Sequence, residues 1–415
     1  ATINQEKLGT YLDGNNALSL MNILGGGTLQ TFSIFALGVS PYITAQIIVE
    51  LLATDVLPAL TELRKQGQYG RKKMEYATRY LTLMLGAVQA YGIIKTMETS
   101  ELVSFEAGQY AWLTYIYVVI VMLAGSMIVM WLGDQISVKG IGNGISMIIF
   151  AGIVSSLPSQ VSTAFTLWVT ETRGMGDSAQ IRGTFQFLLY MLSFLAIVSF
   201  VTFIELSKRK IPVQHSGKGG GQTQSMAKAS FLPIKINSAG VIPVIFASSI
   251  MMAPSVVASF LGADTNAEWL NVFNYSKMTQ MGDNFAMPWG LIIYLVLTIA
   301  FTFFYANIQI NPQQLAENFQ KNGSYIPGIR PGNETERYVR KVLNRVTFIG
   351  ALALAIIAAL PAVLTLTIFK DYSQLALGGT GLIIVVGVAL ELNNQIDGLL
   401  AGKSFDEVVA GGGQN

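Results

Sequence analysis

The chain has 415 residues, a formal net charge of +2 and a charged fraction of 12%, about half the roughly 25% that is typical of soluble proteins. Hydrophobic residues make up 52% of the chain, which is more apolar surface than a soluble core can hold, so the composition indicates a membrane protein. The absence of cysteine and the single histidine, His215, exclude disulfides, thiolate or histidine-cluster metal sites and a cysteine nucleophile.

Long apolar runs, taken in chain order, predict nine membrane-spanning helices. Their approximate ranges are 33–53, 77–95, 111–132, 143–157, 184–206, 240–261, 288–310, 345–369 and 378–398. Lysine and arginine gather in three polar segments between them, 54–79, 207–240 and 311–345. With Lys139 and Lys403, these segments hold 20 of the 26 basic residues. The positive-inside rule therefore places them and the C-terminus in the cytoplasm.

This topology puts residue 1 outside the cell, although no signal-like or basic stretch precedes the first predicted span. We therefore expect a further N-terminal part, including one more span, ahead of Ala1. A cleaved signal peptide is the alternative interpretation.

The first and sixth predicted spans share a sequence frame, G-V-x-P-x-I. It begins at Gly38 and again at Gly240, 202 residues later. A glycine and a proline in a membrane helix expose backbone groups that protein or a water-filled cavity must cover. Matching interruptions in two halves of a membrane protein indicate where the substrate passes. The general frequency of glycine and proline in membrane helices would explain one frame but not the match.

The predicted spans carry almost no charge away from their ends. The exceptions all fall near cytoplasmic ends: Glu50, Arg79, Glu205 and Glu391. Ion-coupled carriers and voltage sensors use ionisable groups inside the membrane, so a secondary transporter with inverted repeats is disfavoured. An intramembrane protease or transferase is a weaker alternative, because the spans contain no serine–histidine, paired-aspartate or zinc set.

Two of the basic segments are too long to be simple connectors. Segment 207–240 contains Lys208, Arg209 and Lys210, and segment 311–345 contains Arg330 between two Pro-Gly pairs. These charges either set the topology and contact lipid only or also dock a large acidic partner, such as a motor or ribosomal RNA. The glycine run 219–221 lacks the frame of a phosphate-binding loop.

Six strings in this chain resemble the SecY family, the channel subunit of the bacterial protein translocase. They lie at 32–45, 130–136, 140–146, 237–247, 326–332 and 378–386, in the family's order. The resemblance runs from about residue 17 to 398. It implies an all-α, polytopic fold of ten spans, nine of them in this chain, in two pseudo-symmetric inverted halves that hinge as a clamshell channel.

The resemblance also implies a division of the chain. Residues 1–183 would form the N-terminal half, 184–398 the C-terminal half with both docking loops, and 399–415 a cytoplasmic tail. The spans that carry Pro41 and Pro243 would form the lateral gate. A plug at about 17–30 would close the channel from outside, and its candidate residues are Leu18, Leu24, Gly25, Gly26 and Gly27. Three glycines suit an element that moves on a weak hinge.

The family's pore ring corresponds here to Val39, Ile43, Ile145, Ile149, Ile245 and Ile384, all aliphatic. A hydrophobic constriction excludes water and ions without a fixed charge that would hold a passing polypeptide. By resemblance, Arg330 with Lys208, Arg209 and Lys210 would dock the SecA ATPase or a ribosome.

The resemblance implies further partners and a location. The partners are the SecE and SecG subunits, precursor polypeptides with signal sequences, and membrane lipid. The chain would be a multi-pass protein of the bacterial cytoplasmic membrane, neither an enzyme nor a holder of a cofactor or metal. Its choice between SecA and the ribosome, its oligomeric state and its clients do not follow from the sequence.

Overall fold

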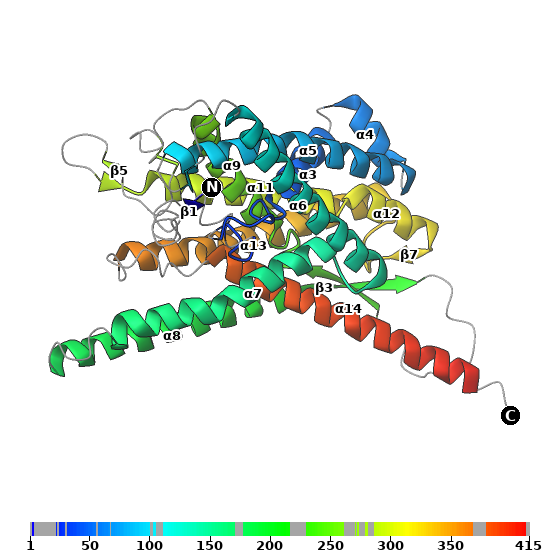
Figure 1. Ribbon diagram of the computed structural model, residues 1–415. Helices are drawn as coiled ribbons and strands as arrows, with labels where there is room; N and C mark the ends of the chain where they lie inside the picture. The colour runs from blue at the N-terminus through cyan, green and yellow to red at the C-terminus, as the bar shows by residue number, and fades with distance from the viewer. Residues whose placement is uncertain are drawn as a thin grey trace.

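The computed structural model describes most of the chain. The described residues are 2–3, 22, 25–29, 31–54, 57–66, 68–99, 103–104, 111–170, 177–215, 230–260, 270, 272–273, 279–280, 286–367 and 379–411. Figure 1 shows a mostly helical molecule in which α8 and α14 contact each other and diverge, their far ends projecting to opposite sides.

Each predicted span overlaps a helix of the structure. These helices are α3 (Ser40–Leu52), α5 (Gln68–Thr99), α6 (Ala111–Lys139), α7 (Gly144–Phe165), α8 (Asp177–Leu206), α9 (Ile242–Phe260), α11 (Trp289–Gln309), α13 (Asn333–Thr367) and α14 (Gly379–Gly411). A short π-helix, Thr166–Thr170, continues α7. Within the described residues, six helical segments are long and apolar enough to cross a membrane, and α3 and part of α9 form shorter apolar helices. The prediction of a helical multi-pass membrane protein is confirmed.

Several helices extend beyond the predicted spans at their polar ends. Helix α5 begins nine residues before its predicted span and α13 begins twelve before its own, while α14 continues to Gly411. Ion pairs one helical turn apart, Arg79 with Glu75 and Arg340 with Glu336, lie in the added turns or next to them. Apolar runs mark only the lipid-covered part of a helix, whereas such pairs support helix in water as well.

The described parts of the predicted loops, 207–215, 230–240 and 311–345, form one folded unit, called the sheet unit below. Strands β3 (Lys208–His215) and β4 (Ser230–Lys235) make an antiparallel hairpin, and β7 (Ser324–Tyr325) pairs with the end of β3. The short helix α12 (Pro312–Lys321) lies between α11 and β7. Ile211 and Ile234 from the hairpin pack with Leu343 of α13 in a shared hydrophobic cluster. This small sheet was not predicted.

The described part of the chain has five other short elements. Helix α4 (Pro58–Lys65) precedes α5, and four two-residue strands form two antiparallel pairs: β1 (Thr2–Ile3) with β2 (Val103–Ser104), and β5 (Thr279–Gln280) with β6 (Ala286–Met287).

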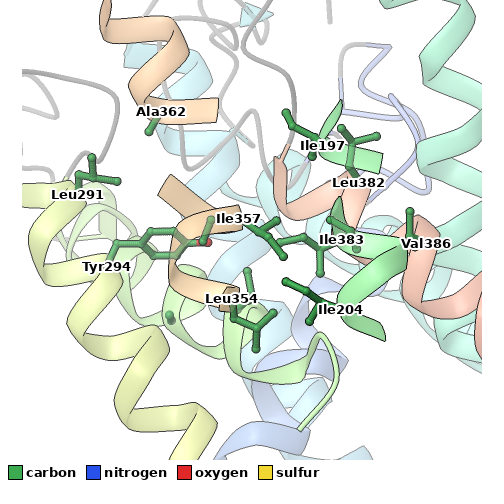
Figure 2. Packing of buried hydrophobic residues seen from close by; sticks show 14 of the residues in the cluster. Ile197, Ile204, Leu291, Tyr294, Leu354, Ile357, Ala362, Leu382, Ile383 and Val386 are labelled. Atoms are coloured by element: carbon green, nitrogen blue, oxygen red, sulfur yellow. The ribbon is translucent and has the colours of Figure 1, made fainter. Parts of the chain in front are cut away.

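The largest hydrophobic cluster lies mostly between α8 and α14 and also includes Ala164 of α7 and Trp168 of the π-helix. Figure 2 shows its centre, where residues of α8, α11, α13 and α14 meet, among them Ile197, Tyr294, Ile357 and Ile383. A second cluster holds the segment before α3, with Leu29, Ala36 and Leu37, against α5 and α6. The segment leading into α3 therefore packs with α5 and α6.

Candidate functional site

The six residues predicted for the pore ring lie in one hydrophobic cluster. Val39 precedes α3, Ile43 is in α3, Ile145 and Ile149 are in α7, Ile245 is in α9 and Ile384 is in α14. Val39, Ile149 and Ile384 are buried, with at most 4% of each residue exposed, and the other three are partly buried. The structure thus brings together aliphatic side chains from elements up to 345 residues apart.

The cluster also contains residues that the sequence analysis did not name. Ile153 and Val388 are buried in it, and Val241 packs against it. Val241 takes the same place in its G-V-x-P-x-I frame as Val39. The repeat itself was therefore the signal that could have identified Val241.

The two frames have the same backbone geometry. Gly38 and Gly240 adopt φ values of +53° and +65°, a left-handed conformation that glycine reaches without strain. A helix begins two residues later in each case, at Ser40 and Ile242, and the proline is its second residue. Proline is tolerated there because the first turn of a helix has no internal partner for its N–H groups. The frame therefore starts a helix, whereas the sequence analysis placed it inside one.

Helices α3 and α9, which carry Pro41 and Pro243, contact each other, and both contact α5. In each helix the frame valine accepts the hydrogen bond of the frame isoleucine: Ile43 N–H donates to the Val39 carbonyl at 3.1 Å, and Ile245 N–H donates to that of Val241 at 3.3 Å. The predicted gate pair is thus a pair of neighbouring helices with equivalent starts.

Part of the predicted plug lies beside the ring. Gly25 to Gly27 are described, whereas Leu18 and Leu24 lie outside the described residues. A β-carbon placed on Gly152 of α7 would lie 3.1 Å from the Gly26 Cα, and one on Gly38 would lie 3.1 Å from the Gly25 Cα. Glycine on both sides allows this close backbone approach. The glycine segment therefore rests on α7 and on the turn that precedes α3.

The predicted docking residues lie on the sheet unit. Lys208, Arg209 and Lys210 are exposed on β3, and Arg330 is exposed in the turn after β7. Two glycines with φ of +81° and +103°, Gly328 and Gly332, flank that turn, and the Thr335 hydroxyl donates to the Arg330 carbonyl at 2.9 Å.

Lys235 is a basic residue of this unit that the sequence analysis did not single out. It lies directly opposite Lys208 across the hairpin. Like charges in this position repel, so an anionic group bound beside Lys208 and Lys235 would stabilise the base of the hairpin.

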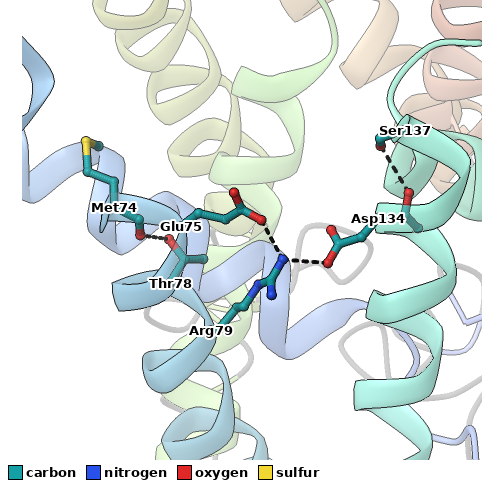
Figure 3. A network of polar contacts seen from close by, with 7 residues as sticks. Met74, Glu75, Thr78, Arg79, Asp134 and Ser137 are labelled. Carbon is teal, nitrogen blue, oxygen red and sulfur yellow. Dashed lines mark hydrogen bonds and ion pairs between the residues drawn. The ribbon is translucent and has the colours of Figure 1, made fainter. Parts of the chain in front are cut away.

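Arg79, the charge predicted near the edge of the second span, is ion-paired. Figure 3 shows its guanidinium between Glu75 of α5, at 2.5 Å, and Asp134 of α6, at 2.7 Å. The side chains of Arg79 and Asp134 are 38% and 29% exposed. The pair links α5 to α6 and explains how a charge is accommodated in a helix that borders lipid.

Within the residues that the structure describes, no group of three or more His, Cys, Asp or Glu side chains could hold a metal ion.

Comparison with known proteins gives a consistent result. A family model described as SecY matches residues 33–393. The chain is 41% identical over 395 residues to the protein translocase subunit SecY of Mycoplasma capricolum, covering 94% of this chain and 80% of the relative. It is 41% identical over 392 residues to that of Bacillus subtilis, covering 93% and 86%.

Solved structures share the fold at lower identity. One is a SecY structure whose description concerns the plug domain and how it stabilises the closed state of the translocation channel. It matches with a TM-score of 0.60 and 18% identity, covering 91% of this chain and 89% of that one. Another, the Sec61 channel of a canine ribosome–channel complex, matches with a TM-score of 0.56 and 17% identity, covering 95% and 92%.

Proposed function

Because this chain belongs to the SecY family, we propose that it is the protein-conducting channel of a bacterial Sec translocon. The observation that carries this proposal is the single cluster of six aliphatic side chains, three of which lie at the starts of the equivalent, neighbouring helices α3 and α9. Such a cluster seals against water and ions when closed and offers a passing polypeptide no charge to bind. The chain acts as a channel subunit and not as an enzyme.

The channel opens when the helices that carry the cluster move apart. Val39 and Ile43 move with the start of α3, and Ile245 moves with the start of α9. A signal sequence that inserts between α3 and α9 separates these side chains and widens the ring. The glycine segment 25–27 leaves its place against α7, and an unfolded chain passes. An apolar segment of that chain exits between α3 and α9 into lipid, because its burial there is favourable.

The sheet unit supplies the docking face for the source of the polypeptide. Arg330, Lys208, Arg209 and Lys210 contact a SecA-type ATPase or the RNA of a translating ribosome, and arginine suits phosphate and carboxylate partners through its planar fork. This face and the C-terminus are cytoplasmic, since the side of the membrane on which they lie, with segment 54–79 and Lys139, holds 20 of the 26 basic residues. SecE and SecG complete the translocon in the bacterial cytoplasmic membrane.

The test is reconstitution. The chain is placed with SecE and SecG in phospholipid vesicles, and SecA, ATP and a secretory precursor are added outside. We expect protease-protected precursor that depends on ATP and on an intact signal sequence. Vesicles with SecE and SecG alone are the control. A correctly folded chain that protects no precursor above this control would contradict the proposal.

A further inference from the structure

The repeat extends four residues upstream of the G-V-x-P-x-I frame, although the sequences there differ. A β-carbon placed on Gly125 of α6 would lie 2.1 Å from the Ile34 carbonyl oxygen, and one on Gly350 of α13 would lie 2.3 Å from that of Ile236. Ile34 and Ile236 are again 202 residues apart. In each half, the segment leading into the frame helix therefore rests on a buried glycine of another helix.

No other residue type fits at these two positions as the structure stands. Carbon and oxygen atoms in contact lie about 3.3–3.6 Å apart, so an alanine would push the segment away by about 1 Å. We call each of these contacts, Gly125 with Ile34 and Gly350 with Ile236, a glycine seat. The seats lie close to the ring cluster in sequence, because Val39 follows Ile34 by five residues and Val241 follows Ile236 by five. A displacement at the seat is thus transmitted directly to two side chains of the ring cluster.

Hydrogen bonds hold the same turns. The buried Ser126 hydroxyl, next to Gly125, donates to the Gly38 carbonyl at 2.9 Å. In the other half, the Asn237 amide donates to the Gly240 carbonyl at 3.1 Å and to Glu205 of α8 at 2.5 Å. The carbonyl of each left-handed glycine therefore has a fixed partner, although the two halves use different side chains.

We propose that Gly125 and Gly350 are paired positioning residues that seat the starts of α3 and α9 and so set the closed seal of the ring. Each gate helix then moves together with the helix that seats it, α6 or α13, and the gate opens between the halves. This inference rests on the proposed function, because the seal matters only in a channel.

The test compares Gly125→Ala and Gly350→Ala in reconstituted vesicles. Two quantities are measured: halide leak without substrate, and translocation of a precursor with a weakened signal sequence relative to one with an intact sequence. We expect both variants to raise the leak and this ratio by about fivefold or more, because each shifts the population from closed toward open. A lesion that merely weakened the fold would lower translocation of both precursors and leave the ratio unchanged.

Gly92→Ala in α5 is the matched control, because a β-carbon there would meet no atom within 4 Å. Ser126→Ala is the second arm, since it removes a hydrogen bond from the same turn without adding volume. Its control is Ser193→Ala, which removes the hydrogen bond from the Ser193 hydroxyl to the Tyr190 carbonyl within α8. We expect Ser126→Ala to raise the leak and the ratio, and both controls to match the unmodified chain.

The inference is overturned if the glycine variants fold and keep the leak and ratio of Gly92→Ala, or if only one half responds. If neither glycine variant accumulates, an unchanged leak in Ser126→Ala overturns it. Failure of the unmodified chain to translocate the intact precursor in the same vesicles is a separate result, which counts against the proposed function itself.

Discussion

At the scale of single residues, the six ring residues have in common that their side chains carry no polar or charged group. All six proposed ring residues are aliphatic and none carries a polar group. The physics of the sequence alone did not identify them, because isoleucine in a membrane helix usually faces lipid or neighbouring helices. Only the resemblance singled them out, and the structure then places them in one cluster from four helices.

Replacement of Ile149 by asparagine is expected to open a water path through the ring. Ile149 is 4% exposed, and a buried amide without partners attracts water or costs about 1–3 kcal/mol. The measurement is halide leak of vesicles without substrate, which should rise. Ile149→Val, which keeps the surface apolar, is the control and should seal as the unmodified chain does. Equal leak in both variants would contradict the role of the ring.

Charge pairing at Arg79 is expected to contribute little to stability. Both partners of the pair with Asp134 remain about a third exposed, and such pairs are worth below about 1 kcal/mol. A double-mutant cycle with Arg79→Gln and Asp134→Asn, read as the free energy of unfolding in detergent, measures the coupling. A coupling energy of several kcal/mol would show that the pair is a main link between α5 and α6.

At the scale of elements, the helices were predictable and the sheet was not. Runs of apolar residues identify spans because lipid requires them. The β3–β4 hairpin is short, and prolines at 212 and 233 argue against a strand within a sheet. The third strand of the sheet, β7, begins more than 100 residues after β3 ends. No local sequence pattern indicates a pairing between strands so far apart in the chain. The exact helix starts at Ser40 and Ile242 were missed for a similar reason, because hydropathy does not mark where a backbone turns.

Removal of the Arg330 charge is expected to weaken partner docking without affecting the seal. The side chain is exposed, and the Thr335 hydroxyl bonds to the backbone carbonyl of Arg330, so Arg330→Ala keeps this contact and leaves the sheet unit folded. We expect at least about tenfold weaker binding of SecA or of ribosomes to vesicles, in line with the loss of an interface arginine. Lys321→Ala, which removes an exposed charge from α12 of the same unit, is the control. Equal loss in both variants would indicate general charge attraction only.

A side chain at Gly152 is expected to loosen the glycine segment. A β-carbon there would lie 3.1 Å from the Gly26 Cα and 3.2 Å from its nitrogen, so the segment must move by a few tenths of an ångström. Gly152→Ala should therefore leak more than the unmodified chain and still translocate an intact precursor. Leak measured beside Gly92→Ala checks this prediction, and identical leak would argue against a plug seated on α7.

At the scale of the whole molecule, the two halves are related through the start of one helix in each. The frame glycine, the helix start, the frame valine and isoleucine and the glycine seat recur at equivalent places in α3 with α6 and in α9 with α13. The sequence showed the frame because its residues are identical. It could not show the seats, since Gly125 and Gly350 lie in other helices and are separated by 225 residues, not 202.

The central claim is that a polypeptide passes through the ring, and the absence of cysteine allows a direct test. A single cysteine is placed at Ile43 or at Ile245, a second in a stalled secretory precursor, and a third variant carries its cysteine at Met84, which is 71% exposed on α5. With SecA and ATP, we predict a disulfide crosslink from both ring positions and none from Met84, lost without ATP or a signal sequence. No crosslink from either ring position in a folded chain that still translocates precursor would contradict the account.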